Sequence, residues 1–188
     1  MKKKLLSILA IAIVCLLTGC AASSYVAQVK QNSLPPLNLA FNVQEVQITD
    51  SRTNQSSEDI KLPFVSKPNS LIKHVPALTP AHKQLIEKVI KENTTHSGVP
   101  VKALINIPDS YKEFTSTWSS EKEKGFAQVQ ISLVNQDSGE LITACDTSGE
   151  LFVQSADATN ERMEEIYQLT LKNVIYNCLK SMPSQVKK

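Results

Sequence analysis

Strict alternation of apolar and polar side chains runs through Ala127-Gln128-Val129-Gln130-Ile131-Ser132-Leu133. Because successive side chains of a β-strand point to opposite faces, the pattern predicts a strand with one face in a core and one toward water. Asp137-Ser138-Gly139 follows, as is typical of a three-residue hairpin turn. A second strand is expected from about Glu140 to Val153, with Gly149 as a bulge or a further turn. Its predicted core-facing side chains are Leu141, Thr143, Cys145, Leu151 and Val153.

Two more strands are expected upstream. Residues 37–43 alternate, and the alternation then slips by one residue, which predicts a bulge near Gln44 or Glu45. Residues 99–107 alternate as well, and Pro108 indicates an edge, bulge or bend before the strand resumes near Phe114 and Trp118. The charged run 121–124 is expected to be the solvated tip of a hairpin.

Two helices complete the predicted domain. Thr79-Pro80 is typical of a helix start and opens an amphipathic segment of about 79–93. Asp157 or Thr159 opens the last helix, whose apolar face ends at Cys178. The resulting fold class is α+β, a single β-α-β-β-β-α domain over residues 37–182 followed by a tail of 183–188. We expect a mostly antiparallel sheet with both helices on one face and the other face partly open.

The N-terminus has the composition of a secretory signal. Lys2, Lys3 and Lys4 precede an uncharged apolar run from Leu5 to Leu17, which is too short to span a membrane. The run ends in Leu17-Thr18-Gly19-Cys20. An ordinary cleaved signal followed by an unmodified cysteine is the alternative interpretation.

This tetrad resembles the lipobox of bacterial lipoproteins. The resemblance implies lipid attachment to the thiol of Cys20, removal of residues 1–19 as the signal peptide, and a lipidated tether over residues 20–36. In such proteins an Asp after the cysteine retains the chain in the inner membrane, whereas Ala21 stands here. The resemblance therefore implies a membrane anchor in the outer membrane, with the domain facing the periplasm.

The cysteines that remain form one pair. Cys15 leaves with the signal and Cys20 carries lipid, so Cys145 and Cys178 are left. An exported chain with two such cysteines usually joins them, and their core-facing positions agree. Two buried thiols are the alternative; a zinc site lacks further ligands at suitable spacing.

Composition and motifs restrict the chemistry. Three of the 20 basic residues lie in the leader, so 17 remain against 18 acidic ones, and no basic footprint for nucleic acid is expected. His74, His82 and His96 share no metal spacing and are interpreted as surface residues, and we predict no metal or other cofactor. Asp109, Asp146 and Asp157 are carboxylates that no spacing selects for catalysis.

Two function classes remain. The element order and the tether resemble small lipoproteins that assist outer-membrane assembly, lipopolysaccharide insertion or lipid-trafficking transporters, which implies a non-catalytic protein with an envelope protein or lipid as partner. A membrane-anchored periplasmic hydrolase is the alternative. The long loop of 49–78 offers Phe64, Val65 and Ile72 for partner binding, with Trp118 as a further candidate. Docking of this loop on its own domain, and burial of Trp118, are the preferred interpretations.

Overall fold

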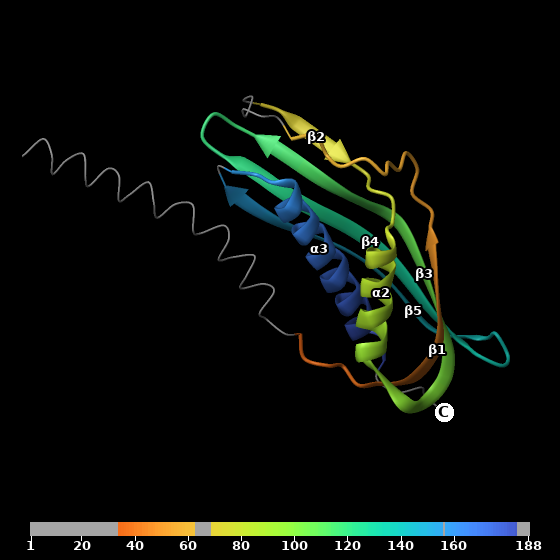
Figure 1. Ribbon diagram of the computed structural model, residues 1–188. Coiled ribbons are helices and arrows are strands. Elements are labelled where there is room, and N and C mark those ends of the chain that lie inside the picture. The colour runs from red at the N-terminus through yellow and green to blue at the C-terminus, as the bar shows by residue number, and fades with distance from the viewer. Residues whose placement is uncertain (1–33, 63–68, 156, 184–188) are drawn as a thin grey trace, which may run out of the picture.

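The computed structural model describes residues 34–62, 69–155 and 157–183. They form a single α+β domain in which two helices cover one face of a five-stranded, mostly antiparallel sheet (Figure 1). The predicted element order is therefore confirmed, with one short additional strand, β2. The elements in chain order are β1 (Leu39–Asp50), β2 (Leu71–His74), α2 (Pro80–Glu92), β3 (Thr94–Ser116), β4 (Glu121–Asn135), β5 (Leu141–Ser155) and α3 (Asn160–Ser181).

The sheet has the order β1-β3-β4-β5. β1 is parallel to the first part of β3, whereas β2 pairs antiparallel with its last part. The predicted bulge in β1 is present between Val43 and Glu45. β3 continues past Pro108, where the register with β4 shifts between Asn106 and Asp109. Pro108 thus bends a strand of 23 residues without ending it.

The run 121–124 is not a solvated tip. The turn lies at Thr117–Ser120, where the Thr117 amide donates to the Ser120 carbonyl at 2.8 Å. Glu123 is fully buried, and its carboxylate accepts from Arg162 Nε at 2.6 Å and from the Thr159 amide at 3.2 Å. Burial raises the pKa of Glu123 against the lowering effect of Arg162. The prediction failed because the partners of Glu123 belong to α3, far along the chain.

β5 differs from the prediction in two places. The register with β4 shifts between Leu133 and Val134, which leaves Leu141 63% exposed and packs Ile142 against the core. Gly149 is neither bulge nor turn, because it lies within the strand opposite Ala127. A Cβ at this position would lie 3.1 Å from Val174 Cγ2, so the glycine admits close packing of α3.

The helices begin where their caps predict. Thr79 caps α2 and Thr159, rather than Asp157, caps α3. Of the described helices, neither is long and apolar enough to cross a membrane.

The core lies between these helices and the sheet, and its largest fully buried members include Phe41, Ile86, Ile90, Ile105, Ile131, Leu133, Tyr167 and Leu171.

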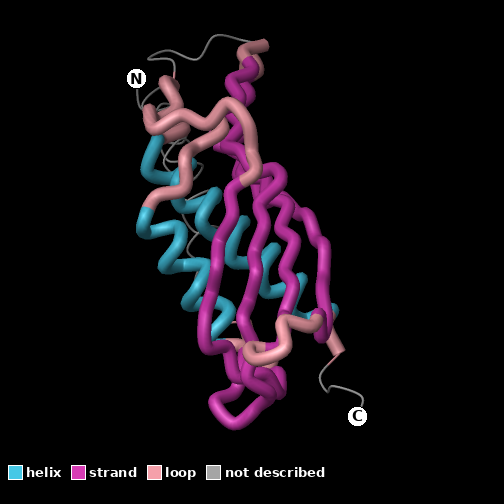
Figure 2. Tube along the Cα trace, turned by 90° about the vertical axis from the view of Figure 1, so that its right-hand side faces the viewer, coloured by secondary structure: helices cyan, strands magenta, loops and turns pink. Residues whose placement is uncertain are grey.

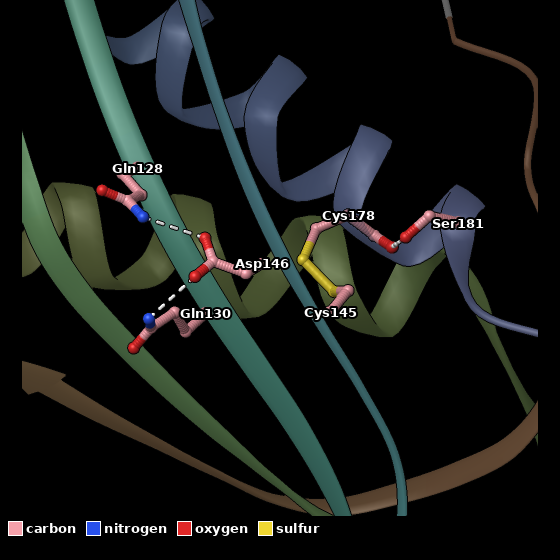
Figure 3. Close-up of a disulfide and its surroundings, with 6 residues drawn as sticks. All are labelled: Gln128, Gln130, Cys145, Asp146, Cys178 and Ser181. Carbon is pink, nitrogen blue, oxygen red and sulfur yellow. Dashed lines mark hydrogen bonds between the residues drawn. A yellow bond between two sulfur atoms is a disulfide. The ribbon is translucent and has the colours of Figure 1, made fainter.

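A disulfide joins Cys145 of β5 to Cys178 of α3, as the cysteine parity predicted (Figure 3). Their Cα atoms are 5.5 Å apart, and 33 positions of sequence separate them. The bond fastens the last strand to the helix that covers it.

Candidate partner-binding face

The face of the sheet opposite the helices is open. Figure 2 looks onto it, with the helices behind the strands. Alternation along β3, β4 and β5 places every second side chain on this face, and these side chains are partly buried on β3 and β4 but mostly exposed on β5. Two kinds of side chain gather there, in two adjacent parts of the face.

The first part is an aromatic-lysine surface, which we define as Lys73, Tyr111, Lys122, Lys124, Phe126 and Phe152. The rings of Tyr111 and Phe126 stack with their centroids 4.9 Å apart. Lys73 Nζ lies 3.6 Å from the centroid of Tyr111, and Lys122 Nζ lies 4.1 Å from that of Phe152. Such pairs cover part of each ring while leaving the ammonium groups near solvent.

One lysine of this surface, Lys124, lies beside two carboxylates. Lys124 Nζ lies 2.6 Å from Glu113 and 3.7 Å from Glu150. Burial by itself lowers the pKa of Lys124, but the hydrogen bond and the charge of Glu113 raise it above its usual value. Lys124 therefore stays protonated beside two carboxylates, whereas Lys73 and Lys122 lie over aromatic rings.

Two large apolar side chains border the aromatic-lysine surface. Trp118, in the β3–β4 turn, is 86% exposed, and Leu71 at the start of β2 is 65% exposed. Phe114 is buried, but the expected burial of Trp118 is wrong. The turn carries Trp118 past the end of β3, beyond Ile60 and Met163, which cover Phe114.

The second part of the open face is a polar ladder across the strands. Gln128 Nε2 and Gln130 Nε2 donate to the two carboxylate oxygens of Asp146 at 3.0 and 2.9 Å (Figure 3). Asn106 donates to Gln130, and Ser51 donates to Asn106. The hydrogen bonds from Gln128 and then Gln130 lower the pKa of Asp146. Asp146 is thus a fixed, exposed carboxylate on β5.

A different polar network lies beneath the helices. Glu164 of α3 lies 2.5 Å from Lys112 Nζ and 2.6 Å from His82 Nε2. The Thr79 amide donates to His82 Nδ1, so Nε2 carries the proton that His82 donates to Glu164. Burial opposes ionisation of Glu164, but these donors lower its pKa to about 2. His82 is buried, which corrects its interpretation as a surface residue.

Arg52 extends this network toward β1. Its guanidinium donates to both oxygens of Asp50 at 2.7 and 2.6 Å and to Ser110 Oγ at 2.8 Å. Tyr167 OH lies 2.8 Å from the same Ser110 oxygen. No buried polar side-chain atom in the described part of the chain lacks a partner. Ser110, Tyr167 and His82 resemble catalytic groups in type, yet all three are buried. Ser110 and Tyr167 are hydrogen-bonded to each other, and His82 is hydrogen-bonded to Thr79 and Glu164.

The remaining predicted candidates are scattered. Among the described residues no group of acidic, Cys or His side chains is arranged to hold a metal ion. His96 is exposed and His74 is partly buried, with a pKa lowered by burial and by Lys112. Asp109 lies at the β3 bulge, and Asp157 accepts from Arg162 at 3.2 Å.

The long loop docks on its own domain. Ile60 is buried with Phe114 and Met163, and Ile72 packs against that cluster. Ile72 therefore packs into the interior of the domain, and its prediction as a partner-binding residue is wrong. Phe64 and Val65 lie outside the described residues, as does Cys20.

One cavity of about 270 Å³ lies where the chain enters the domain. Leu34 and Pro36 line it together with side chains at the C-terminal ends of α2 and on α3, including Asn93 and Tyr176. It lies at the end of β3 opposite the turn with Trp118, because Leu39 pairs with the start of β3.

Tyr111, Phe126 and Phe152 were not predicted as site residues. The signal for them is an aromatic side chain at a position that the alternation assigns to the polar face, as at Phe126 between Lys124 and Gln128. Stacking of Tyr111 on Phe126 depends on the register of β3 with β4, which no local pattern specifies.

Comparisons with known proteins find a similarity of shape. No family model and no curated protein matches this chain. Among solved structures, it is similar to a protein of Xanthomonas campestris from the DUF330 family, with 9% identity and a TM-score of 0.40 over 79% of this chain and 86% of that one. A similarity of this size carries no information on activity or partners.

Proposed function

We propose that this chain is a lipoprotein anchored in the bacterial outer membrane, facing the periplasm, and that it binds an envelope partner without catalysis. The observation that carries the proposal is Trp118, exposed in the turn that joins the two strands carrying Tyr111 and Phe126 of the aromatic-lysine surface. Exposed tryptophan and clustered aromatic rings are typical of binding surfaces, because a partner that covers them gains apolar contact.

The proposed anchor rests on the lipobox-like tetrad that ends at Cys20. The proposed export of the chain rests on the disulfide. Two or three acyl chains hold a protein on a membrane effectively permanently, whereas one chain does so reversibly. Disulfides persist in oxidising compartments such as the periplasm, and Cys145–Cys178 supports export of the chain.

The position of the surface favours a periplasmic partner. Tyr176 OH donates to the Pro35 carbonyl, and the Leu37 amide donates to Asn93, so the chain enters the domain at the C-terminal ends of the helices. Trp118 follows the opposite end of β3 (Figure 1). The 23 residues of β3 could span at most about 75 Å if straight, and the bend at Pro108 shortens this distance. The aromatic-lysine surface therefore lies far from the point where the tether joins the domain.

An anchored hydrolase needs a nucleophile that substrate can reach. Ser110 and His82 are buried, and the hydrogen-bond capacity of each is used within the domain. This arrangement supports partner binding over hydrolysis.

Site-specific photo-crosslinking in the native envelope tests the surface. A photoreactive amino acid replaces Trp118 in one strain and Phe152 in another, and Lys83, exposed on α2, serves as the control position. We expect one defined adduct from the first two positions and none from Lys83. Equal labelling from all three positions contradicts the proposal.

The anchor has its own test. Cys20→Ala removes the thiol that receives lipid, so we expect an uncut precursor without radiolabelled fatty acid. A Cys20→Ala protein that still incorporates fatty acid and fractionates with the outer membrane contradicts the lipoprotein assignment.

A further inference from the structure

The outer edge of β5 is unpaired. β4 lies on one side of β5, and no described strand lies on the other. From Thr143 to Ser155 the strand keeps an unbroken register with β4, so it presents a regular row of backbone donors and acceptors. Such a row is a template for another strand.

β5 lacks three of the devices that usually protect a sheet edge. Between Thr143 and Ser155 it has no proline, no lysine and no bulge. The opposite edge, β1, is different, because two register shifts interrupt its pairing with β3. Bulges of this kind twist an edge and discourage further pairing. The contrast singles out β5.

The disulfide stiffens this template. Cys145 lies near the start of the unbroken β4–β5 register and is bonded to α3 through Cys178. Thr143 to Ser155 are held by β4, and the first part of this segment is also fastened to the helix. An edge already ordered in its binding conformation loses less entropy when a strand adds to it.

The charges on β5 specify what kind of strand fits. Asp146 and Glu150 project on the open face, and β5 has no basic residue. Asp146 is held by neutral amides and has no cationic partner among the described residues. Glu150, whose side chain is 48% exposed, lies 3.7 Å from Lys124, and Glu113 is the nearer partner of that lysine at 2.6 Å. Two carboxylates on one face, one of them held by hydrogen bonds, favour basic side chains on the incoming strand.

A second copy of this chain fits less well. In an antiparallel pairing of two β5 strands centred on Ser148, Asp146 of each copy faces Glu150 of the other. Like charges directly opposite one another on a sheet face are destabilising. The acidic residues thus act against self-association and leave the edge for a different chain.

We propose that the edge of β5 takes up an extended strand of a partner protein that carries lysine or arginine at alternate positions, facing Asp146 and Glu150. The alternating side chains between them lie on the helix-covered side, near Leu151 and Val153, and are apolar. This inference deepens the proposed function and rests on it, because it specifies the chemistry of the partner.

The test uses a capped ten-residue peptide of alternating lysine and valine, with the mature, oxidised, lipidated protein in non-ionic detergent. Controls are a peptide of the same composition with lysines and valines in two blocks, and an alternating glutamate-valine peptide. Fluorescence anisotropy measures the Kd, and hydrogen exchange by mass spectrometry locates the strand. We expect tighter binding of the alternating lysine peptide and slowed amide exchange over 143–155.

Charge reversal sharpens the test. Asp146→Lys with Glu150→Lys is expected to raise the Kd of the lysine peptide about tenfold and to confer binding of the glutamate peptide. Glu87→Lys with Glu92→Lys on α2 changes the net charge equally and is expected to leave both affinities unchanged.

Three results overturn the inference: equal binding of the alternating and block peptides, equal effects of the two double variants, or binding without slowed exchange in β5. Sedimentation of the free protein as a dimer with protected β5 amides also overturns it, and identifies a second copy as the occupant. If the peptide experiment fails but a defined crosslinked adduct forms at Trp118, only the inference about the β5 edge is rejected. If the peptide binds as expected but no crosslinked adduct forms, the proposed Trp118 surface is rejected instead.

Discussion

Two carboxylates of this domain, Glu164 and Asp146, both accept several side-chain hydrogen bonds but differ in their surroundings. Glu164 accepts from Lys112, His82 and Gln168 between the helices and the sheet. Asp146 accepts from two glutamines on the open face. Removing one partner of a buried ion pair leaves the other charge without a partner and away from water. At the surface, water replaces a lost hydrogen-bond partner. The first carboxylate therefore holds the fold, and the second is available to a partner.

The largest expected effect is loss of the charge of Glu164. Glu164→Gln leaves the ammonium of Lys112 buried without a counter-charge, so the free energy of unfolding should fall by about 3 to 5 kcal/mol. Urea denaturation followed by circular dichroism measures it. Glu161→Gln, exposed in the first turn of the same helix, is the control and should change stability by less than about 1 kcal/mol. Equal losses in both variants would break the comparison.

Loss of the disulfide should follow closely. Cys145→Ala with Cys178→Ala releases a long loop in the unfolded chain, at a cost of about 3 to 4 kcal/mol on the chain-entropy model. Urea denaturation of the oxidised protein and of the variant provides the measurement. An unchanged midpoint would show that packing of α3 on β5 suffices without the bond.

The loss of unfolding free energy at acid pH should depend on Glu164. Its pKa falls from 4.5 to about 2 on folding, so its contribution is complete above about pH 4.5 and is lost as the pH falls toward 2. The stability difference between the wild type and Glu164→Gln should therefore narrow over this range. A difference that stays constant from pH 6 to pH 2.5 in denaturation experiments would contradict the assignment.

The smallest expected effect is at Asp146. Asp146→Asn keeps the shape of the side chain at an exposed position, so unfolding free energy should change by less than about 0.5 kcal/mol. Thermal denaturation provides the measurement. A loss above 1 kcal/mol would make the polar ladder a structural element like the network beneath the helices, and would weaken its case as a binding feature.

Local sequence patterns predicted the strands and helices whose limits and core faces depend only on nearby residues. The alternation at 127–133 specifies the core face of β4, and Thr79-Pro80 specifies the start of α2, because the physics of each acts within a few residues. The cysteine pair was predictable because parity leaves a single pairing. The aromatic-lysine surface was not, since Phe126 and Tyr111 meet only through the register of β3 with β4.

The sequence by itself determined the α+β order, the core faces of β4 and α3 and the cysteine pairing, because hydrophobic periodicity and parity are local or countable properties. Only the tertiary structure decided that Glu123 and His82 are buried and that Trp118 and Leu141 are exposed. Burial of a charged group depends on a partner: Arg162 for Glu123 and Glu164 for His82, each on a helix distant in sequence. Exposure of an apolar group depends on where a turn or a register shift falls, and both are fixed by pairing between strands.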